Sequence, residues 1–263
     1  MAKGFDCATP LSASLAAKFA SQGFTFVCRY LAPVGSRKRL TVGEAADISA
    51  AGLYVVSVFE RGAANALQGA EQGREDGALA LQYAREVGQP EGSVIYAAVD
   101  TDVNAASYDA IEAYMRAFDE QIPGYELGAY GEYEVCKMLQ DRGAISKVWQ
   151  TYAWSRGAKL DAPNLYQFEN DVQVNGIGID RDESDGDAGG WKVGMAIKQN
   201  VLDADLANEA IAFIEKDYEA NKELYLEHLD SGNMDGAQAC SRQMAYDNTV
   251  ANRLRDAAGL PRE

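Results

Sequence analysis

Short apolar segments alternate with amphipathic segments over the first 190 residues of this chain. Most of the apolar segments lack polar alternation, as expected for parallel strands that are covered on both faces. Eight segments are predicted to be strands, the last of them on the weakest pattern: GFD (4–6), FTFVCRYL (24–31), YVVSVFE (54–60), SVIYAAVD (93–100), ELGAYGE (126–132), KVWQTYA (147–153), LYQFEN (165–170) and GIGID (176–180).

Amphipathic stretches with helix signals separate these segments. Thr41 and Glu44 form the S/T-x-x-E arrangement of a capping box, which predicts that a helix begins near residue 42. A longer helical pattern closes at Gly88, and another stops before Pro123. Seven or eight buried strands that alternate with helices predict an α/β fold.

Two α/β architectures fit this pattern, a closed (β/α)8 TIM-like barrel and an open doubly wound sheet. The chain contains neither the G-x-G-x-x-G fingerprint nor the G-x-x-x-x-G-K-[ST] phosphate loop that many open sheets use to bind nucleotides. The barrel is therefore the favoured prediction, as a domain over residues 1–190.

The character of the chain changes after Gly190. Residues 200–230 and 235–258 are predicted to form two helices, joined by the turn sequence SGNMDG. Two helices alone bury little apolar surface, so we expect this hairpin to pack on the barrel or on a second copy of itself. We assign it to a second domain at 196–263, with cell-wall targeting or homo-oligomer formation as its hypothetical role.

Charge and hydropathy narrow the choice of partners. The net charge is −16, from 24 basic and 40 acidic residues, and the only basic cluster is Arg37–Arg39. Nucleic acid and anionic membrane surfaces are therefore not expected as partners. No run of 18 apolar residues and no apolar leader segment occurs, so we expect a chain that is made in the cytoplasm without a signal peptide.

Histidine is nearly absent, which excludes several reaction classes. The single His228 lies in a charged helical stretch, so neither a Ser-His or Cys-His nucleophile pair nor a histidine-rich zinc site is expected. The acidic run DRDESDGD (180–187) lacks the calcium-loop frame and is interpreted as a solvated loop. We expect no metal and no cofactor, and a hydrolase built this way would depend on carboxyl groups.

Acidic residues collect where the predicted strands end, which is the place where a parallel barrel carries its active site. A single acid there is more often a helix cap than a catalyst, so the recurrence carries the prediction. Adjacent like charges such as Asp100 and Asp102 are unfavourable without a use. The catalytic candidates are Asp6, Glu60, Asp100, Asp102 and Glu132, and the substrate-binding candidates are Tyr30, Tyr130, Gln150, Tyr152, Gln167 and Asp180.

A pocket of acids with aromatic walls and no histidine is typical of carbohydrate chemistry. Glycoside hydrolysis needs one protonated carboxyl as proton donor and anionic character to support an oxocarbenium-like centre. Crowded carboxylates push their pKa values apart, so that one stays protonated while its neighbour ionises. Aromatic faces stack on sugar rings, and amides can hold hydroxyl or acetamido groups.

The order of these motifs (GFD, F-x-x-RY, V-D-x-D, Y-x-E, W-Q-x-Y, Y-Q-F and a late I-D) resembles the glycoside-hydrolase-like family of domain of unknown function 1906. That family is related to glycoside hydrolase family 25, the lysozymes of the Chalaropsis type. The resemblance covers about residues 3–185. It implies a (β/α)8-type barrel that acts on peptidoglycan, often as a phage endolysin or a secreted wall enzyme. By position, Asp6, Asp100, Asp102, Tyr130, Gln167 and Asp180 match its motif residues.

One departure from that pattern concerns the proton donor. Family 25 has glutamate as donor at the second position of D-x-E, whereas this chain has Asp102, which is one methylene shorter. Either the substrate lies deeper, or Glu132 or Glu60 is the donor, or the barrel binds sugar without cutting it.

The leading hypothesis is an endolysin of muramidase type that cleaves the β-1,4 backbone of bacterial peptidoglycan after release from the cytoplasm of the host. In this hypothesis Asp102 or Glu132 is the acid, while Asp100 and Asp6 supply negative charge. The alternatives are a non-catalytic glycan-binding barrel and an N-acetylglucosaminidase on the same fold.

Overall fold

The computed structural model describes residues 1–184, 186–196 and 204–262. They form two compact units, a barrel unit of residues 1–141, 145–184 and 186–196, and a second unit of residues 142–144 and 204–262. Each unit is described by itself.

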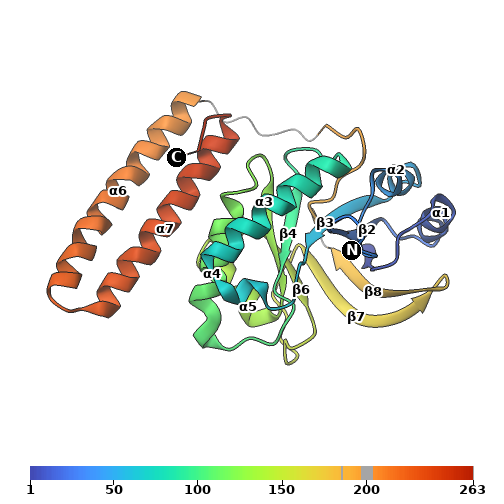
Figure 1. Cartoon of the computed structure of the whole chain (residues 1–263), viewed down its shortest axis with the longest axis horizontal. Helices are drawn as coiled ribbons and strands as arrows, with labels where there is room; N and C mark the ends of the chain where they lie inside the picture. Colours follow the sequence, from blue (N-terminus) through green and yellow to red (C-terminus); the bar gives the residue numbers. More distant parts are fainter. Residues whose placement is uncertain (185, 197–203, 263) are drawn as a thin grey trace. The chain divides into compact units, whose positions relative to one another are not determined.

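Eight strands close into a barrel in which neighbours in sequence are neighbours in space (Figure 1). The predicted closed barrel is thus confirmed, and each predicted apolar segment contributes to a strand. The strands are β1 (Ala2–Asp6), β2 (Phe26–Leu31), β3 (Tyr54–Phe59), β4 (Val94–Ala98), β5 (Glu126–Gly131), β6 (Lys147–Thr151), β7 (Leu165–Val174) and β8 (Ile177–Ser184).

The last strand differs from the expected parallel arrangement. Strands β1 to β7 run parallel, whereas β8 is antiparallel to both β7 and β1. The cause is the tight turn at Asn175 and Gly176, whose φ angles are 56° and 87°. Asn-Gly with positive φ at both positions is the strongest short hairpin signal, and it sends the chain straight back along β7.

Five helices cover the first part of the barrel. Thr41 Oγ1 accepts a hydrogen bond from the backbone N–H of Glu44 at 3.2 Å, which confirms the predicted helix start. The described connections from β6 to β7 and from β7 to β8 carry no helix. The helices are α1 (Ala13–Ser21), α2 (Val42–Ala50), α3 (Ala70–Val87), α4 (Tyr108–Asp119) and α5 (Tyr133–Asp141), with the 3-10 turns η1 (Asn65–Gln68) and η2 (Ala105–Ser107).

Large aromatic side chains fill the lower part of the barrel. Phe26, Tyr96 and Trp149 belong to the buried interior cluster. Glycines on the neighbouring strands make room for two of them, because a Cβ at Gly4 would overlap the Phe26 ring and a Cβ at Gly128 would overlap the Tyr96 ring. A site can therefore open only above this layer, at the carboxyl ends of the parallel strands.

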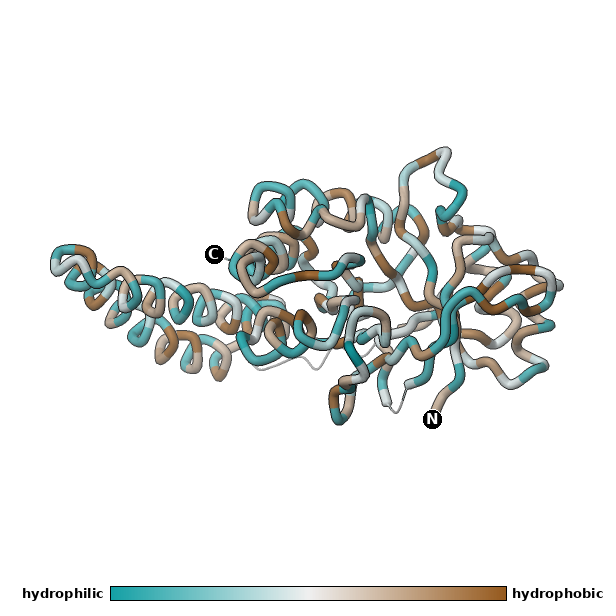
Figure 2. Tube along the Cα trace, turned by 90° about the horizontal axis from the view of Figure 1, so that it is seen from below, coloured by the Kyte–Doolittle hydropathy of each residue, from teal (hydrophilic) through white to brown (hydrophobic). Residues whose placement is uncertain are grey.

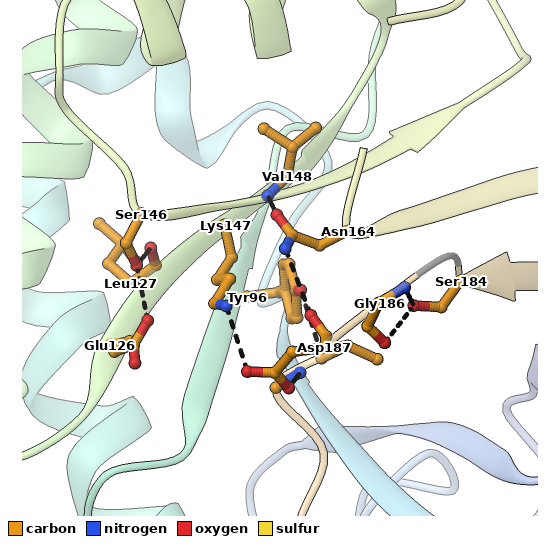
Figure 3. A network of polar contacts seen from close by, with 12 residues as sticks. Tyr96, Glu126, Leu127, Ser146, Lys147, Val148, Asn164, Ser184, Gly186 and Asp187 are labelled. Atoms are coloured by element: carbon orange, nitrogen blue, oxygen red, sulfur yellow. Dashed lines mark hydrogen bonds and ion pairs between the residues drawn. The ribbon is translucent and has the colours of Figure 1, made fainter. Parts of the chain in front are cut away.

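Asp187 and Ala188, which follow β8, make polar contacts with residues of β4, of β6 and of the segment before β7, and Figure 3 shows this network. Tyr96 donates its hydroxyl hydrogen bond to the carbonyl of Ala188 at 3.2 Å. Lys147 Nζ lies 3.2 Å from Asp187 Oδ2, and Asn164 Nδ2 donates to the Asp187 carbonyl at 3.2 Å. These contacts hold Asp187 and Ala188 against β4, the first residue of β6 and the residue that precedes β7.

The barrel unit continues beyond the boundary that we placed at 190 and includes the described residues up to 196, with Trp191 among them. The Trp191 side chain is fully buried, and its Nε1 donates to Ser57 Oγ at 3.0 Å. Its backbone exchanges two hydrogen bonds of 2.8 Å with Val55. The residue that anchors this segment to β3 is therefore Trp191.

The second unit is a helical hairpin. Helices α6 (Ala204–Asp230) and α7 (Met234–Ala257) pack side by side, as Figures 1 and 2 show. Both predicted helices are present, although residues 200–203 of the first prediction lie outside the described residues. No helix in the described part of the chain has the length and apolar character that a membrane span requires.

Candidate active site

A cavity of about 210 Å³ opens at the carboxyl ends of the parallel strands. It is smaller than the roughly 300–1,000 Å³ of pockets that hold drug-sized ligands, so its size suits a single sugar ring. The cavity is lined by Asp6, Tyr30, Val58, Glu60, Ala98, Asp100, Tyr130, Trp149, Ala153, Trp154, Gln167, Asn170 and Asp180.

The structure brings most of the residues predicted for the site to this cavity. Seven of the eleven candidates line it, namely Asp6, Tyr30, Glu60, Asp100, Tyr130, Gln167 and Asp180. Four candidates do not line it, namely Asp102, Glu132, Gln150 and Tyr152.

Asp6 is the most buried carboxyl group that lines the cavity, with 5% of the residue exposed. Gln167 Nε2 donates a hydrogen bond to Asp6 Oδ2 at 2.7 Å. Gln167 Oε1 in turn accepts from the Tyr130 hydroxyl at 3.0 Å and from Thr151 Oγ1 at 2.7 Å. Because both hydroxyls meet the amide oxygen, the amide nitrogen faces Asp6.

Burial raises the pKa of Asp6 from 3.8 to about 7, and the negative charge of Asp180 adds to the rise. The hydrogen bond from Gln167 acts in the opposite direction. Asp180 lies directly across from Asp6 in the antiparallel β1–β8 pair, so both carboxyls are at the same level of the barrel. A carboxyl that titrates near neutral pH can give and take a proton, as acid–base catalysis requires.

Sequence reasoning missed Asp182, which lies below Asp6 on β8 and is fully buried. Its Oδ1 accepts a hydrogen bond from Trp149 Nε1 at 2.9 Å, and its buried Oδ2 has no well-formed partner among the described residues. Burial and the charge of Asp6 raise the pKa of Asp182 well above its usual value.

The interpretation of DRDESDGD as a solvated loop is therefore wrong for residues 180–184, which form the end of β8. The error arose because charged residues dominate the segment. The signal that identifies this strand is Asn175-Gly176, since a two-residue hairpin turn requires a second strand directly after it. In that strand, Asp180 and Asp182 are at alternate positions and share the interior face.

Asp100 and Glu60 occupy a different part of the cavity wall. Glu60 Oε2 lies 2.8 Å from Lys38 Nζ, and that ammonium group lies 4.6 Å from the centre of the Tyr30 ring. Burial and the charge of Glu60 raise the pKa of Asp100, whereas the positive charge of Lys38 lowers it. Glu60 is held in an ion pair with Lys38, and Asp100 remains open to the cavity.

The two acids favoured as donors lie outside the cavity. The Asp102 side chain is 59% exposed and lies 3.8 Å from Nη2 of Arg156. Glu132 is 2% exposed, and its Oε1 accepts a hydrogen bond from the backbone N–H of Val103 at 3.2 Å. Burial is the main cause of the raised pKa of Glu132. Glu132 therefore fixes the loop that follows Asp100.

Gln150 and Tyr152 are also placed elsewhere. Gln150 Nε2 donates to the Ala158 carbonyl at 2.8 Å, and Gln150 Oε1 accepts from the Leu160 N–H at 2.9 Å. The buried amide therefore fastens the loop after β6 and is not available to a sugar. Tyr152 is 44% exposed and does not line the cavity. That lining instead includes Trp154 from the same loop, which no sequence pattern had indicated.

The family model of the Rv2525c-like, glycoside hydrolase-like domain matches residues 17–184. The match covers more than half of the chain, so the chain belongs to this family, as the resemblance of its motifs implied.

Similar proteins come from mycobacteria and bacilli. Rv2525c of Mycobacterium tuberculosis, whose name describes a provisional peptidoglycan hydrolase, is 29% identical over 150 residues, or 54% of this chain and 62% of that protein. YbfG of Bacillus subtilis is 28% identical over 212 residues, or 69% of this chain and 28% of that protein. The chain thus matches less than two thirds of either relative's length.

The crystal structure of Tat-secreted Rv2525c with L-tartrate superposes with a TM-score of 0.63 at 25% identity, covering 70% of this chain and 95% of that one. The modular autolysin LytC of Streptococcus pneumoniae shares the fold alone, with a TM-score of 0.50 at 9% identity over 69% of this chain and 46% of that one.

Proposed function

We propose that this member of the Rv2525c-like glycoside hydrolase-like family is a peptidoglycan hydrolase of muramidase type, which cleaves the β-1,4 glycan backbone by catalysis with carboxyl groups. The observation that carries the proposal is Asp6, a buried carboxyl whose pKa is about 7, in the same cavity as Asp100 and Asp180. Aromatic walls beside such acids suit a sugar ring. The family membership and the name of Rv2525c support the same substrate class.

In the proposed reaction, Asp6 in its protonated form gives its proton to the glycosidic oxygen. The C–O bond breaks, and the leaving chain departs as an alcohol. Asp100, which is less buried than Asp6, acts in this reaction as the carboxylate that stabilises positive charge developing at the anomeric carbon. Water then adds to that carbon, and its surplus proton returns to the carboxylates. Burial raises the pKa of Asp182, which disfavours a second negative charge below Asp6.

A turbidity assay on purified Gram-positive cell walls tests the proposal. Wild-type protein should clear the walls, and Asp6→Asn should not, because an amide cannot donate the proton that cleavage needs. Analysis of the new reducing ends then identifies the bond, since a muramidase leaves N-acetylmuramic acid there and an N-acetylglucosaminidase leaves N-acetylglucosamine. Intact walls with the wild-type protein, over several wall types, would count against the proposal.

One observation favours a second candidate, a barrel that binds glycan without cutting it. The residue at the donor position of D-x-E is aspartate, and its side chain is directed to Arg156 outside the cavity. The two candidates differ in a pull-down with insoluble walls. A hydrolase releases soluble fragments as it binds, whereas a binding barrel sediments with the walls and releases none.

The endolysin role and the hairpin's role belong to the same proposal. Co-expression with a membrane-pore protein in a Gram-positive host should cause lysis that depends on the pore if the chain acts as an endolysin. Phe213 and Met234 of the hairpin are 72% and 65% exposed, and in this proposal they are contact residues for self-association through α6 and α7. Sedimentation velocity over a concentration series measures this self-association, and Phe213→Ser should weaken the association.

A further inference from the structure

The geometry points to a sugar-binding subsite formed by Trp154 and Asn170, in which the indole stacks on a neutral pyranose ring and the Asn170 carboxamide accepts a hydrogen bond from that ring. The inference rests on the proposed function in taking a glycan as the ligand. It adds the residues that hold one ring of the glycan beside Asp6 and Asp100.

Trp154 is the exposed tryptophan of the chain. Trp149 and Trp191 are 2% and 0% exposed, whereas Trp154 is 40% exposed although it lines the cavity. An indole at the wall of a polar cavity offers a flat apolar face together with an N–H donor, which is the combination that a sugar ring with an apolar face and polar edges requires.

The backbone that carries this indole is strained. Trp154 and Arg156 have φ angles of 57° and 52°, in the left-handed region that bulky residues rarely adopt. Such a conformation persists only where its surroundings hold it, and it concentrates at functional sites. Three hydrogen bonds to Ser155 Oγ hold the loop in this conformation.

Ser155 fastens the loop between the two strained residues. Its Oγ donates to the Thr151 carbonyl at 2.6 Å and accepts from the Tyr133 N–H at 2.9 Å. Gln150 Nε2 donates to the same Oγ at 3.2 Å. Ser155, Thr151 and Gln150 are buried, so the loop is fixed before a ligand arrives, which lowers the entropy cost of binding.

Asn170 supplies the polar half of the subsite from β7. It lines the cavity, and its Oδ1 is buried without a hydrogen-bond partner among the described residues. A buried acceptor without a donor is costly, so a hydroxyl or amide N–H of a ligand ring would stabilise it. The lining holds four carboxyl groups and, among the described residues, neither lysine nor arginine. The site therefore favours a neutral ring over an anionic one.

Isothermal calorimetry with the β-1,4-linked tetramer of N-acetylglucosamine tests the subsite. Trp154→Ala should weaken Kd about tenfold and Asn170→Ala about fivefold, the usual effects of losing an aromatic contact and a hydrogen bond. Phe168→Ala is the matched control, because Phe168 is also 40% exposed and lies on β7 outside the cavity lining. In the wild type, indole fluorescence should shift to shorter wavelength on binding, since Trp154 alone of the three indoles is exposed.

Trp154→Gly separates binding from folding. Glycine adopts positive φ without strain, so this variant should keep or raise the Tm while its Kd weakens as in Trp154→Ala. A lowered Tm with unchanged Kd would make Trp154 a structural residue and overturn the inference.

Wall cleavage is measured on the same samples. Cleavage with unchanged affinity in both Trp154 variants would overturn the subsite alone, and a wild type that neither binds nor cleaves would overturn the subsite and the proposed function together.

Discussion

Gln167 Nε2 donates a hydrogen bond of 2.7 Å to Oδ2 of Asp6, a residue that lies 161 positions earlier in the chain. The contact joins the first strand of the barrel to the seventh across the cavity. This hydrogen bond opposes the effect of burial, because it lowers the pKa of the Asp6 carboxyl. The pair therefore controls the pH range in which Asp6 can carry a proton.

Gln167→Ala should move the pH profile of kcat/KM toward higher pH on its basic side. The hydrogen bond from Gln167 lowers the pKa of Asp6, so its loss lets that pKa rise and keeps the acid protonated longer. Initial rates of wall clearing from pH 5 to 9 measure the shift. Gln173→Ala, an exposed change on the same strand, is the control and should leave the profile in place. A basic limb that stays in place in Gln167→Ala would contradict the role assigned to this amide.

Asp6→Asn should abolish lysis, by about 10²–10⁴-fold, the usual contribution of one acid–base group. It should also stabilise the fold at alkaline pH. The pKa of Asp6 is about 7 in the folded protein and 3.8 in the unfolded chain, so the wild type loses stability as the pH rises from about 4 to 7. The amide cannot ionise and escapes this loss.

Thermal unfolding between pH 4 and 8 measures this effect. The Tm difference between Asp6→Asn and the wild type should be small at pH 4 and should grow in favour of the variant up to about pH 7. A constant difference over the whole range would mean that Asp6 is not the buried titrating group.

Glu132→Gln and Glu132→Ala distinguish a proton donor from a loop anchor. The glutamine oxygen can still accept the hydrogen bond from Val103 N–H, so Glu132→Gln should keep most of the activity, while Glu132→Ala should lower kcat by loosening the loop that carries Asp100. Asp102→Asn, at an exposed position outside the cavity, should keep activity as well. Loss of all activity in Glu132→Gln would restore Glu132 as the donor.

Glu44→Ala should destabilise the barrel by about 3–5 kcal/mol, the usual cost of breaking a buried ion pair. Glu44 Oε1 lies 2.7 Å from Arg29 Nε and accepts from the Leu11 N–H at 2.9 Å, and the Arg29 and Glu44 side chains are 0% and 4% exposed. Lys137→Ala removes an exposed ion pair with Asp141 and should change stability by less than about 1 kcal/mol. Chemical denaturation gives both values, and equal effects would show that the burial of the pair has no energetic weight.

The strands and helix starts could be predicted because each depends on a local pattern. The apolar run from Val94 to Ala98 is buried on both faces wherever the barrel folds, and Thr41 caps a helix through a residue three positions away. The same reasoning correctly placed seven candidates at one cavity, namely four acids, two tyrosines and one glutamine, because the carboxyl ends of parallel strands meet at one edge.

The rest of the site depends on contacts between distant residues. Asp102 and Glu132 follow strand ends in the sequence, but whether such a side chain reaches the cavity or holds a loop depends on the backbone beyond the strand. Asp182 is interior because β8 continues to Ser184 and places Asp180 and Asp182 on the same face, and the pair Asn175 and Gly176 is the local signal for that strand. The left-handed backbone that presents Trp154 has no comparable local signal.

The antiparallel seam between β1 and β8 also has a consequence for synthesis on the ribosome. β1 emerges first, but the strand that completes its pairing emerges last, since Ala2 pairs with Ser184. The barrel stays open until translation has passed residue 184, and contacts between residues this far apart in the sequence form slowly. Asp6 and Asp180 meet only at that closure. A nascent chain that stops short of β8 therefore has no complete pocket, so the acidic site forms only when the barrel closes.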